Sequence, residues 1–353
     1  MKKVGIRQVA AEAGVSIAAV SKILNPESVS TIQVSEETRR RVLAAVDQLG
    51  YRPSYSARLL RGESSRTIGF ALSLPLDYSG AYLSDYYVRI LNGMGHIASL
   101  NDYQILLLNG VDYRHFMDIK RLDAMVVVDY RLRENPHLSA MQEMFDHFKA
   151  RQYPFVVING NDSVPCIRVD NRAGMLQVAE HIEERGYRSV GFIGEITPNP
   201  QRHHLERVDA LRRELEKRRI AFSEAAYING VRPDLPEQPR SGRYSHADGR
   251  MALRYLYEKK QLPRCLVCGH DFIAFGVMQQ ALELNLRIPG DLAVIGFDDT
   301  PLAAEYFPPL TSVRQPLEEF GAMTVNYLLE KIKHPELNIN RVVQPALVVR
   351  KSS

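Results

Sequence analysis

The sequence predicts a small all-α N-terminal domain followed by an α/β body of doubly wound parallel sheets. Apolar residues with helical spacing, each run closed by a glycine, fill the first 50 residues. From residue 67 onward, short apolar runs that are typical of buried strands alternate with amphipathic helical segments. This alternation is the pattern of parallel sheets covered by helices on both faces. The chain has 353 residues, 45% of them hydrophobic, which is enough for two or three domains with large cores.

The N-terminal part has the pattern of a helix-turn-helix. The i, i+3, i+4, i+7 spacing of apolar residues over 6–13 predicts a short helix, which Gly14 ends by permitting a left-handed turn. Ser16 is placed to cap a second helix almost at once. Two short helices across so tight a turn form a helix-turn-helix. A third helix is predicted from Ser35 to Gly50, with an apolar face formed by Val42, Leu43, Val46 and Leu49.

Two stretches carry a resemblance to a known family. AGVSIAAVSKILN, at 13–25, is followed at 34–62 by VSEETRRRVLAAVDQLGYRPSYSARLLRG. Together they resemble the lactose-repressor (LacI/GalR) family of transcription regulators, and the similarity runs from about Val4 to the C-terminal strand. In that family YRPSYSARLLRG is a hinge helix, here of about two turns, which is too short to be stable alone and is expected to fold on a partner.

The resemblance implies a periplasmic-binding-protein-like body of two lobes that exchange strands. We therefore expect a helix-turn-helix head over 1–52, a hinge helix and linker over 53–66, an N-lobe over 67–170 with 316–335, and a C-lobe over 171–315 with 336–353.

The resemblance also assigns DNA contacts. The second helix would lie in the major groove, with Ile17 and Ala18 against thymine methyl groups and Lys22 able to reach a guanine edge. Leu60 matches the wedge leucine that opens a base step in the minor groove, with Arg61 beside it. The full set of expected DNA-binding residues is Ser16, Ile17, Ala18, Ser21, Lys22, Tyr55, Ala57, Leu60 and Arg61.

A second set of residues matches the family's effector cleft. Arg207 matches the cleft arginine and Asp298 the cleft carboxylate, a donor fork and an acceptor that together suit hydroxyl groups. Tyr86 and Tyr87 stand where the family has paired aromatics, and core packing is an equal alternative for both. The other expected effector contacts are Asn159, Tyr244 and His270. Asp271 is interpreted instead as a cap of its strand-to-helix turn.

Several features allow two interpretations. The Pro- and Arg-rich segment 230–249 fits a surface insertion, or a loop that covers a ligand cleft. His203 and His204 fit a solvated pair better than a metal site, because adjacent side chains at a helix start diverge. Cys265 and Cys268 form a CxxC pattern, but on a strand they would point to opposite faces, so they are interpreted as structural. No metal site and no cofactor are expected.

Charge and composition favour a DNA-binding protein. The net charge is +4, and residues 1–66 contain 11 Lys and Arg against 6 Asp and Glu, so the excess positive charge lies in the head. A basic head suits phosphate binding, although a solvated basic surface would give the same count. With no signal-peptide pattern, no membrane-length apolar span and only three cysteines, the chain is expected in the cytoplasm.

The leading hypothesis is a ligand-responsive transcription regulator, a repressor that binds a near-palindromic operator as a homodimer. Its expected partners are double-stranded operator DNA, a small-molecule effector and a second copy of the chain, with no membrane. The effector class expected first is a carbohydrate. The rival hypothesis is a stand-alone sugar-binding or sugar-converting protein with an incidental helical head. No nucleophile or acid/base set can be assembled for an enzyme, and the head together with the hinge favours the regulator.

Overall fold

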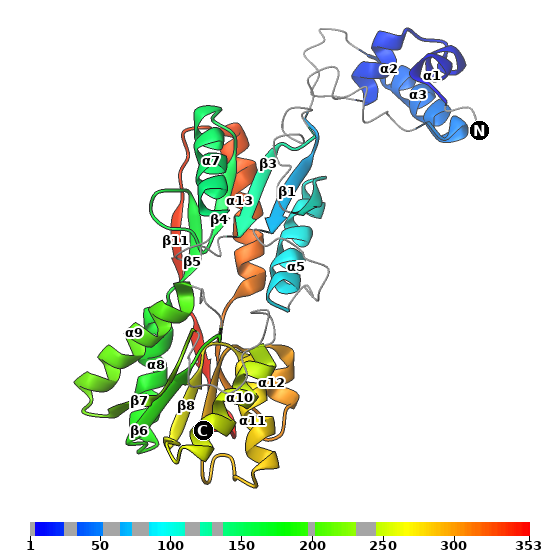
Figure 1. The fold of residues 1–353 in the computed structure, drawn as a ribbon. Coiled ribbons are helices and arrows are strands. Elements are labelled where there is room, and N and C mark those ends of the chain that lie inside the picture. Colours follow the sequence, from blue (N-terminus) through cyan, green and yellow to red (C-terminus); the bar gives the residue numbers. More distant parts are fainter. Residues whose placement is uncertain are drawn as a thin grey trace. The chain divides into compact units, whose positions relative to one another are not determined.

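The chain forms two compact units, Met1–Ser65 and Arg66–Ser353. The computed structural model describes residues 4–24, 34–51, 64–72, 85–109, 121–128, 137–196, 202–230 and 245–353 (Figure 1). The predicted hinge contacts Tyr55, Ala57, Leu60 and Arg61 and the predicted effector contact Tyr244 therefore lie outside the described residues.

The described residues of the first unit form three helices: α1 (Ile6–Ala13), α2 (Ile17–Leu24) and α3 (Glu36–Leu49). Both ends of α1 and α3 and the start of α2 are as predicted. Gly14 and Gly50 end α1 and α3 with φ of 62° and 59°, a left-handed conformation that favours glycine. One apolar face of each helix packs into a shared core. Leu43 was expected in that core and is 47% exposed, because the buried face of α3 runs through Val42 and Ala45 instead.

The second unit contains two sheets, each with six described strands. The first has the order β11-β5-β4-β3-β1-β2, with every pair parallel. Its strands are β1 (Thr67–Leu72), β2 (Gln104–Asn109), β3 (Ala124–Val128), β4 (Phe155–Ile158), β5 (Cys166–Val169) and β11 (Asn340–Val343).

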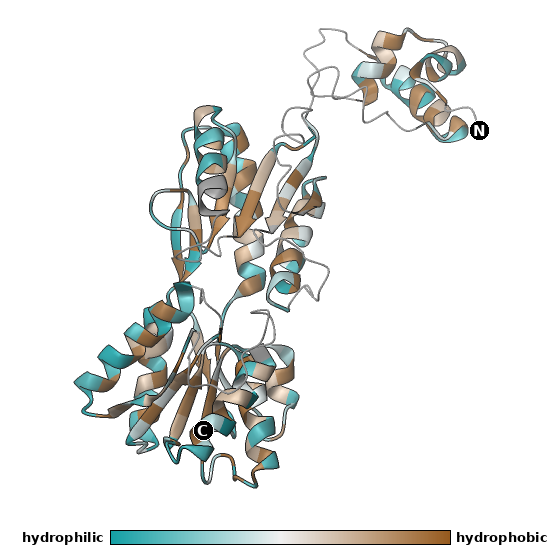
Figure 2. Ribbon diagram, viewed as in Figure 1, coloured by the Kyte–Doolittle hydropathy of each residue, from teal (hydrophilic) through white to brown (hydrophobic). Residues whose placement is uncertain are grey.

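The second sheet has the order β12-β10-β9-β8-β6-β7. All its pairs are parallel except β10 with β12, which are antiparallel. Its strands are β6 (Ser189–Ile193), β7 (Ala221–Ile228), β8 (Cys265–Cys268), β9 (Ala293–Asp298), β10 (Thr311–Arg314) and β12 (Ala346–Val348). In Figure 2 the central strands of both sheets are coloured as hydrophobic, which matches the apolar runs from which they were predicted.

Alternation along the strands separates two cores in each sheet. In β3, Val126 packs with α5 (Asp85–Leu100) and α13 (Leu317–Lys333), while Val127 packs with α7 (His137–Ala150) on the opposite face. In β8, Leu266 and Val267 divide in the same way. The helices on the first face of the second sheet are α10 (Ser245–Glu258), α11 (Asp271–Glu283) and α12 (Pro301–Glu305), and those on the second are α8 (Asn171–Glu184) and α9 (Arg202–Lys217).

Cys265 and Cys268 are free and buried on opposite faces, as predicted.

The chain passes between the sheets three times: between β5 and α8, between β10 and α13, and between β11 and β12. The expected domain limit after residue 335 is wrong in this respect. Residues 340–343 pair with β5 of the first sheet, from Asn340 opposite Cys166 to Val343 opposite Val169. The last crossing therefore falls at residues 344–345, because β11 extends the edge of the first sheet and β12 extends the edge of the second.

The expected loop 230–249 is also shorter than the sequence indicated, because α10 begins at Ser245 and includes Gly249. Residues 231–244 lie outside the described residues, so both interpretations of that loop stand untested. In the described segments, no helix is both long and apolar enough to cross a membrane.

Candidate functional site

The helix-turn-helix presents the N-terminal end of α2 to solvent. The Ser16 hydroxyl accepts a hydrogen bond from the backbone N–H of Ala19 at 3.1 Å, which caps α2 as predicted. Val20 and Ile23 bury the inner face of α2 in the core. The expected base-contacting residues Ser16, Ile17 and Ala18 are exposed, and Ser21 and Lys22 are half-buried. A protruding N-terminal turn on a helix with one buried face has the geometry that recognition helices use in the major groove.

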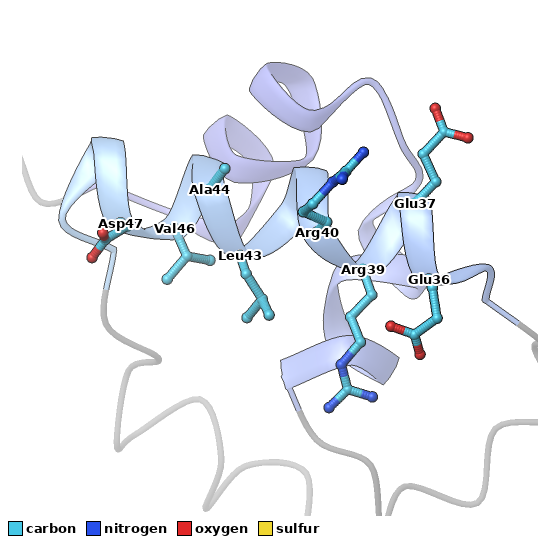
Figure 3. Close-up of a pocket in the computed structure, with 8 residues that line it drawn as sticks. All are labelled: Glu36, Glu37, Arg39, Arg40, Leu43, Ala44, Val46 and Asp47. Carbon is cyan, nitrogen blue, oxygen red and sulfur yellow. The ribbon is translucent and has the colours of Figure 1, made fainter.

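A surface hollow of the first unit lies along α3 and is shown in Figure 3. Acidic residues occupy the first turn of this helix, where the positive end of the helix dipole stabilises them, and three arginines, Arg39–Arg41, follow. The lining residues are Glu36, Glu37, Arg39, Arg40, Leu43, Ala44, Val46 and Asp47. All belong to one helix, and most of their side chains project outward in Figure 3, while Val46 packs against the core. Among the described residues, this hollow is therefore an open helix surface and not a built ligand site.

In the second unit, the candidate effector residues lie at the carboxyl ends of the strands, where open parallel sheets bind ligands. Arg207 on α9 is the most buried of those that the structure describes, with a relative exposure of 3%. Its guanidinium donates to the Gly269 carbonyl oxygen at 2.5 Å and to Asn171 Oδ1 at 3.0 Å. It also stacks on Phe297, 3.4 Å from the ring centroid. These contacts hold the guanidinium group of Arg207 in one orientation.

Asp298 ends β9 in an uncommon backbone conformation, with φ of 113°. For a residue with a side chain such a conformation costs about 1–3 kcal/mol, and such costs concentrate at functional sites. Its Oδ1 accepts a hydrogen bond from Gln315 Nε2 at 2.6 Å. Burial raises the pKa of Asp298 to about 6, partly offset by the positive charge of Arg207.

Tyr86 and Asn159 meet at the edge of the first sheet, where Asn159 follows β4. Asn159 Nδ2 donates to the Tyr86 hydroxyl oxygen at 2.8 Å. Burial raises the pKa of Tyr86, and the charges of Asp298 and Arg207 act on it as well, so these four residues share one electrostatic environment. Tyr87 is only 7% exposed and belongs to the core of the first sheet, which favours the packing interpretation for this residue.

The histidine prediction is wrong for His204, which is fully buried on α9 and not solvated. Its ring lies edge to face with that of His270 at 5.6 Å between centroids, and Glu195 is the third member of the cluster. Burial lowers the pKa of His270 to about 3 and that of His204 well below its usual value. The sequence missed this cluster because α9 and β8 are far apart in the chain.

The capping prediction for Asp271 is also wrong. His270 occupies the N-cap position of α11, and the buried Asp271 carboxylate instead accepts hydrogen bonds from the Thr300 N–H at 2.7 Å and from the Ser312 hydroxyl at 2.6 Å. Burial raises the pKa of Asp271 to about 8. Asp271 therefore ties α11 to the segment that follows β9 and to β10, and stabilises the backbone next to Asp298.

Sequence reasoning did not identify Arg89 on α5. It forms a bidentate ion pair with Glu318 of α13, at 2.7 Å and 2.9 Å, and lies 3.4–3.5 Å from the carbonyl oxygens of Asp298, Asp299 and Gln315. Arg89 thereby links a helix of the first sheet to the end of β9 in the second. Its spacing of three residues from Tyr86 on the same helix was the one sequence signal that could have indicated it.

A helix-turn-helix with an exposed recognition helix and a body of two parallel sheets define a class, the DNA-binding transcription regulators with a periplasmic-binding-protein-like body. Comparison with protein families agrees. Residues 5–54 match the model described as bacterial regulatory proteins, lacI family, and residues 179–353 match the periplasmic binding protein-like domain.

Curated relatives and solved structures extend this match over the whole chain. An HTH-type transcriptional regulator from the aml 5' region of Streptomyces limosus is 32% identical, covering 99% of this chain and 94% of that protein. The HTH-type transcriptional repressor PurR of Proteus mirabilis is 30% identical, covering 98% and 96%. The structure of the Lac repressor dimer bound to operator and the anti-inducer ONPF aligns over 99% of both chains, with a TM-score of 0.79 and 23% identity. The chain belongs to the lacI family and is a DNA-binding transcriptional regulator, not an enzyme.

Proposed function

We propose that this regulator is a repressor that binds a near-palindromic operator as a homodimer and responds to a small hydroxyl-bearing molecule, most simply a sugar. The observation that carries the effector proposal is the meeting of Arg207, Asp298, Tyr86 and Asn159 at the carboxyl edges of the two sheets. A fixed donor fork, a carboxylate and an aromatic ring are the groups that recognise a polyhydroxylated ring. Tyr244 and His270 stay in the proposed contact set.

The dimer is supported by similarity alone, and similarity adds to the structural support for a sugar. One solved structure of similar fold is titled a Lac repressor dimer on its operator, and another a CelR–cellobiose complex, with a TM-score of 0.66 and 22% identity. The flat face of Tyr86 suits a purine as well as a sugar, so the effector screen has to contain both. On DNA, we propose that α2 reads bases, with Ser16, Ile17, Ala18, Ser21 and Lys22 in contact, and that Leu60 opens a central base step.

A thermal-shift screen of the full chain against sugars, nucleosides and purines tests the effector proposal. A ligand should raise the melting temperature of the wild-type protein, and Asp298→Asn should weaken its binding at least about tenfold, because the variant removes an anionic acceptor while keeping the side-chain shape. Arg207→Gln should do the same. Arg213→Gln, on an exposed position of the same helix, is the matched control.

Operator affinity without ligand separates the two sites. It should be unchanged in Asp298→Asn when measured by fluorescence anisotropy on DNA selected from a random pool. Unchanged ligand affinity in Asp298→Asn would contradict the cleft assignment. Analytical ultracentrifugation of the protein on that DNA should give two chains per site, and one chain per site would contradict the homodimer.

A further inference from the structure

A cluster of potential metal ligands lies at the carboxyl edge of the second sheet, where two strand ends and one helix converge. Glu195 follows β6, His270 follows β8, and His204 lies in the first turn of α9. One ligand atom from each of these side chains lies within 4.8 Å of the other two. Among the described residues this is the group of histidine, cysteine and carboxylate side chains that could hold an ion.

The environment of His204 independently indicates a ligand. The residue is fully buried, and neither ring nitrogen has a hydrogen-bond partner among the described residues. A buried polar group without a partner costs about 1–3 kcal/mol, so such a group needs an explanation such as a bound ion. The free-energy cost of removing the His204 ring from water would be offset if one of its nitrogens coordinated a cation.

The local backbone is shaped to admit this ring. Gly269 immediately precedes His270, and a side chain at that position would place its Cβ only 2.7 Å from the Nδ1 and Cε1 atoms of His204. With glycine at this position, β8 can end close against the His204 ring of α9, and this approach brings His204 beside His270. The packing thus positions two imidazoles and a carboxylate at one point.

We propose that Glu195, His204 and His270 form a site for a divalent transition-metal ion of the zinc type. Two imidazoles and one carboxylate are a common zinc ligand set, in which the fourth position is left for a water or another ligand atom. Tetrahedral ligands at about 2.0–2.1 Å from the ion lie about 3.4 Å apart, so closing from 4.8 Å requires side-chain shifts of about 1 Å. Rotation of exposed or half-buried side chains such as His270 supplies shifts of this size.

Electrostatics around the site set a limit on affinity. Arg207 lies one turn after His204 on α9, and its positive charge opposes a second cation nearby. The Glu195 carboxylate supplies the compensating negative charge, and the Arg207 guanidinium is already bound to Asn171 and the Gly269 carbonyl. The site is therefore expected to depend strongly on Glu195, and Glu195→Gln is as informative a variant as the loss of a histidine.

Isothermal titration of chelator-treated full-length protein with zinc chloride tests the proposal, and no effector or DNA is needed. The wild-type chain should bind one zinc ion, and a cobalt titration should produce the visible absorption of a coordinated ion. His204→Gln, His270→Asn and Glu195→Gln should each weaken binding at least about tenfold. His334→Asn, whose side chain is 60% exposed, is the control and should bind like the wild type.

The experiment is decisive even where one variant folds poorly. His204 is fully buried, so the fold of the His204→Gln variant is checked by circular dichroism. If that variant does not fold, the zinc affinities of His270→Asn and Glu195→Gln decide the outcome. Absence of zinc binding by the wild type, or unchanged affinity in both of these variants, would overturn the proposal. Neither result bears on the effector or operator proposals, because the readout is the metal alone.

Discussion

At the scale of single residues, the second unit is notable for charged groups that are buried with specific partners. Arg207 has an amide, a carbonyl and an aromatic ring around it, contributed by α8, the end of β8 and β9. The sequence could assign Arg207 to a cleft only through family resemblance, since its partners lie 36, 62 and 90 residues away. Long-range partners of this kind cannot be obtained from local spacing.

Asp248 gives a prediction about the pH dependence of stability. It is 2% exposed in the first turn of α10, where its Oδ2 accepts a hydrogen bond from the Ile196 N–H at 3.1 Å. Burial raises its pKa from 3.8 to about 6. The folded state therefore binds a proton more tightly than the unfolded state, so the stability that the protonated carboxyl contributes is complete below about pH 4 and is lost as the pH rises through about 6.

Asp248→Asn should remove this dependence, because the amide stays neutral and keeps an oxygen acceptor for Ile196. We expect the free energy of unfolding of the variant, relative to wild type, to rise by about 1–3 kcal/mol between pH 4 and pH 7.5. Urea denaturation at several pH values measures it. Asp209→Asn, at an exposed position on α9, is the control. Parallel pH profiles for wild type and Asp248→Asn would contradict the prediction.

At the scale of elements, each sheet carries a helix pair packed unusually closely through glycines. A Cβ at Gly93 of α5 would lie 1.9 Å from the Glu318 carbonyl oxygen of α13, and one at Gly321 would lie 2.0 Å from the Ile90 carbonyl oxygen. Gly249 of α10 and Gly276 of α11 meet the opposite backbone in the same way, at 2.0 Å and 1.9 Å. Such reciprocal contacts let two helix backbones approach more closely than any side chain would permit.

Gly93→Ala should therefore destabilise the protein, while Gly95→Ala on the same helix should not. The first change forces α5 away from α13 and should lower the free energy of unfolding by about 1–3 kcal/mol or more. A methyl group at Gly95 would meet no atom within 4 Å, so alanine there should raise stability by up to about 1 kcal/mol through its better helix propensity. Thermal and urea denaturation compare the two variants. Equal effects would contradict the close-packing argument.

At the scale of the whole molecule, charge is divided unevenly along the chain. Residues 1–66 contain 11 Lys and Arg against 6 Asp and Glu, while the rest of the chain contains 34 against 35. We therefore expect most of the counterion release on DNA binding to come from the N-terminal part, where the excess positive charge lies.

We expect the operator affinity of the full chain to fall steeply with salt, with a log–log slope of several units, since each phosphate neutralised contributes about 0.9. Lys22→Ala should weaken binding and change which bases are preferred, because Lys22 follows the exposed N-terminal turn of α2. Fluorescence anisotropy between low and physiological salt, on selected and scrambled DNA, measures both effects. A flat salt dependence would exclude phosphate contacts as the main source of affinity.

The sequence alone determined both ends of α1 and α3 and the start of α2 to within a residue, because capping serines, terminal glycines and apolar spacing are local signals that act within one turn. It also determined the central strands of both sheets, since buried parallel strands are continuous apolar runs. Family resemblance supplied the proposed effector residues, of which Arg207, Asp298, Asn159 and His270 lie near the carboxyl ends of strands. These predictions depended on neighbours in the chain or on matched motifs.

Only the tertiary structure decided which sheet the C-terminal strands join, what Asp271 binds, and that His204 is buried beside His270 and Glu195. A strand of three or four residues can extend either sheet, so its place depends on which edge is open when the lobes assemble. Likewise, a histidine on a polar helix end is exposed or buried according to what packs over it. In each case the deciding contact joins residues distant in sequence, and the free energy of that contact is set by packing, which no local pattern encodes.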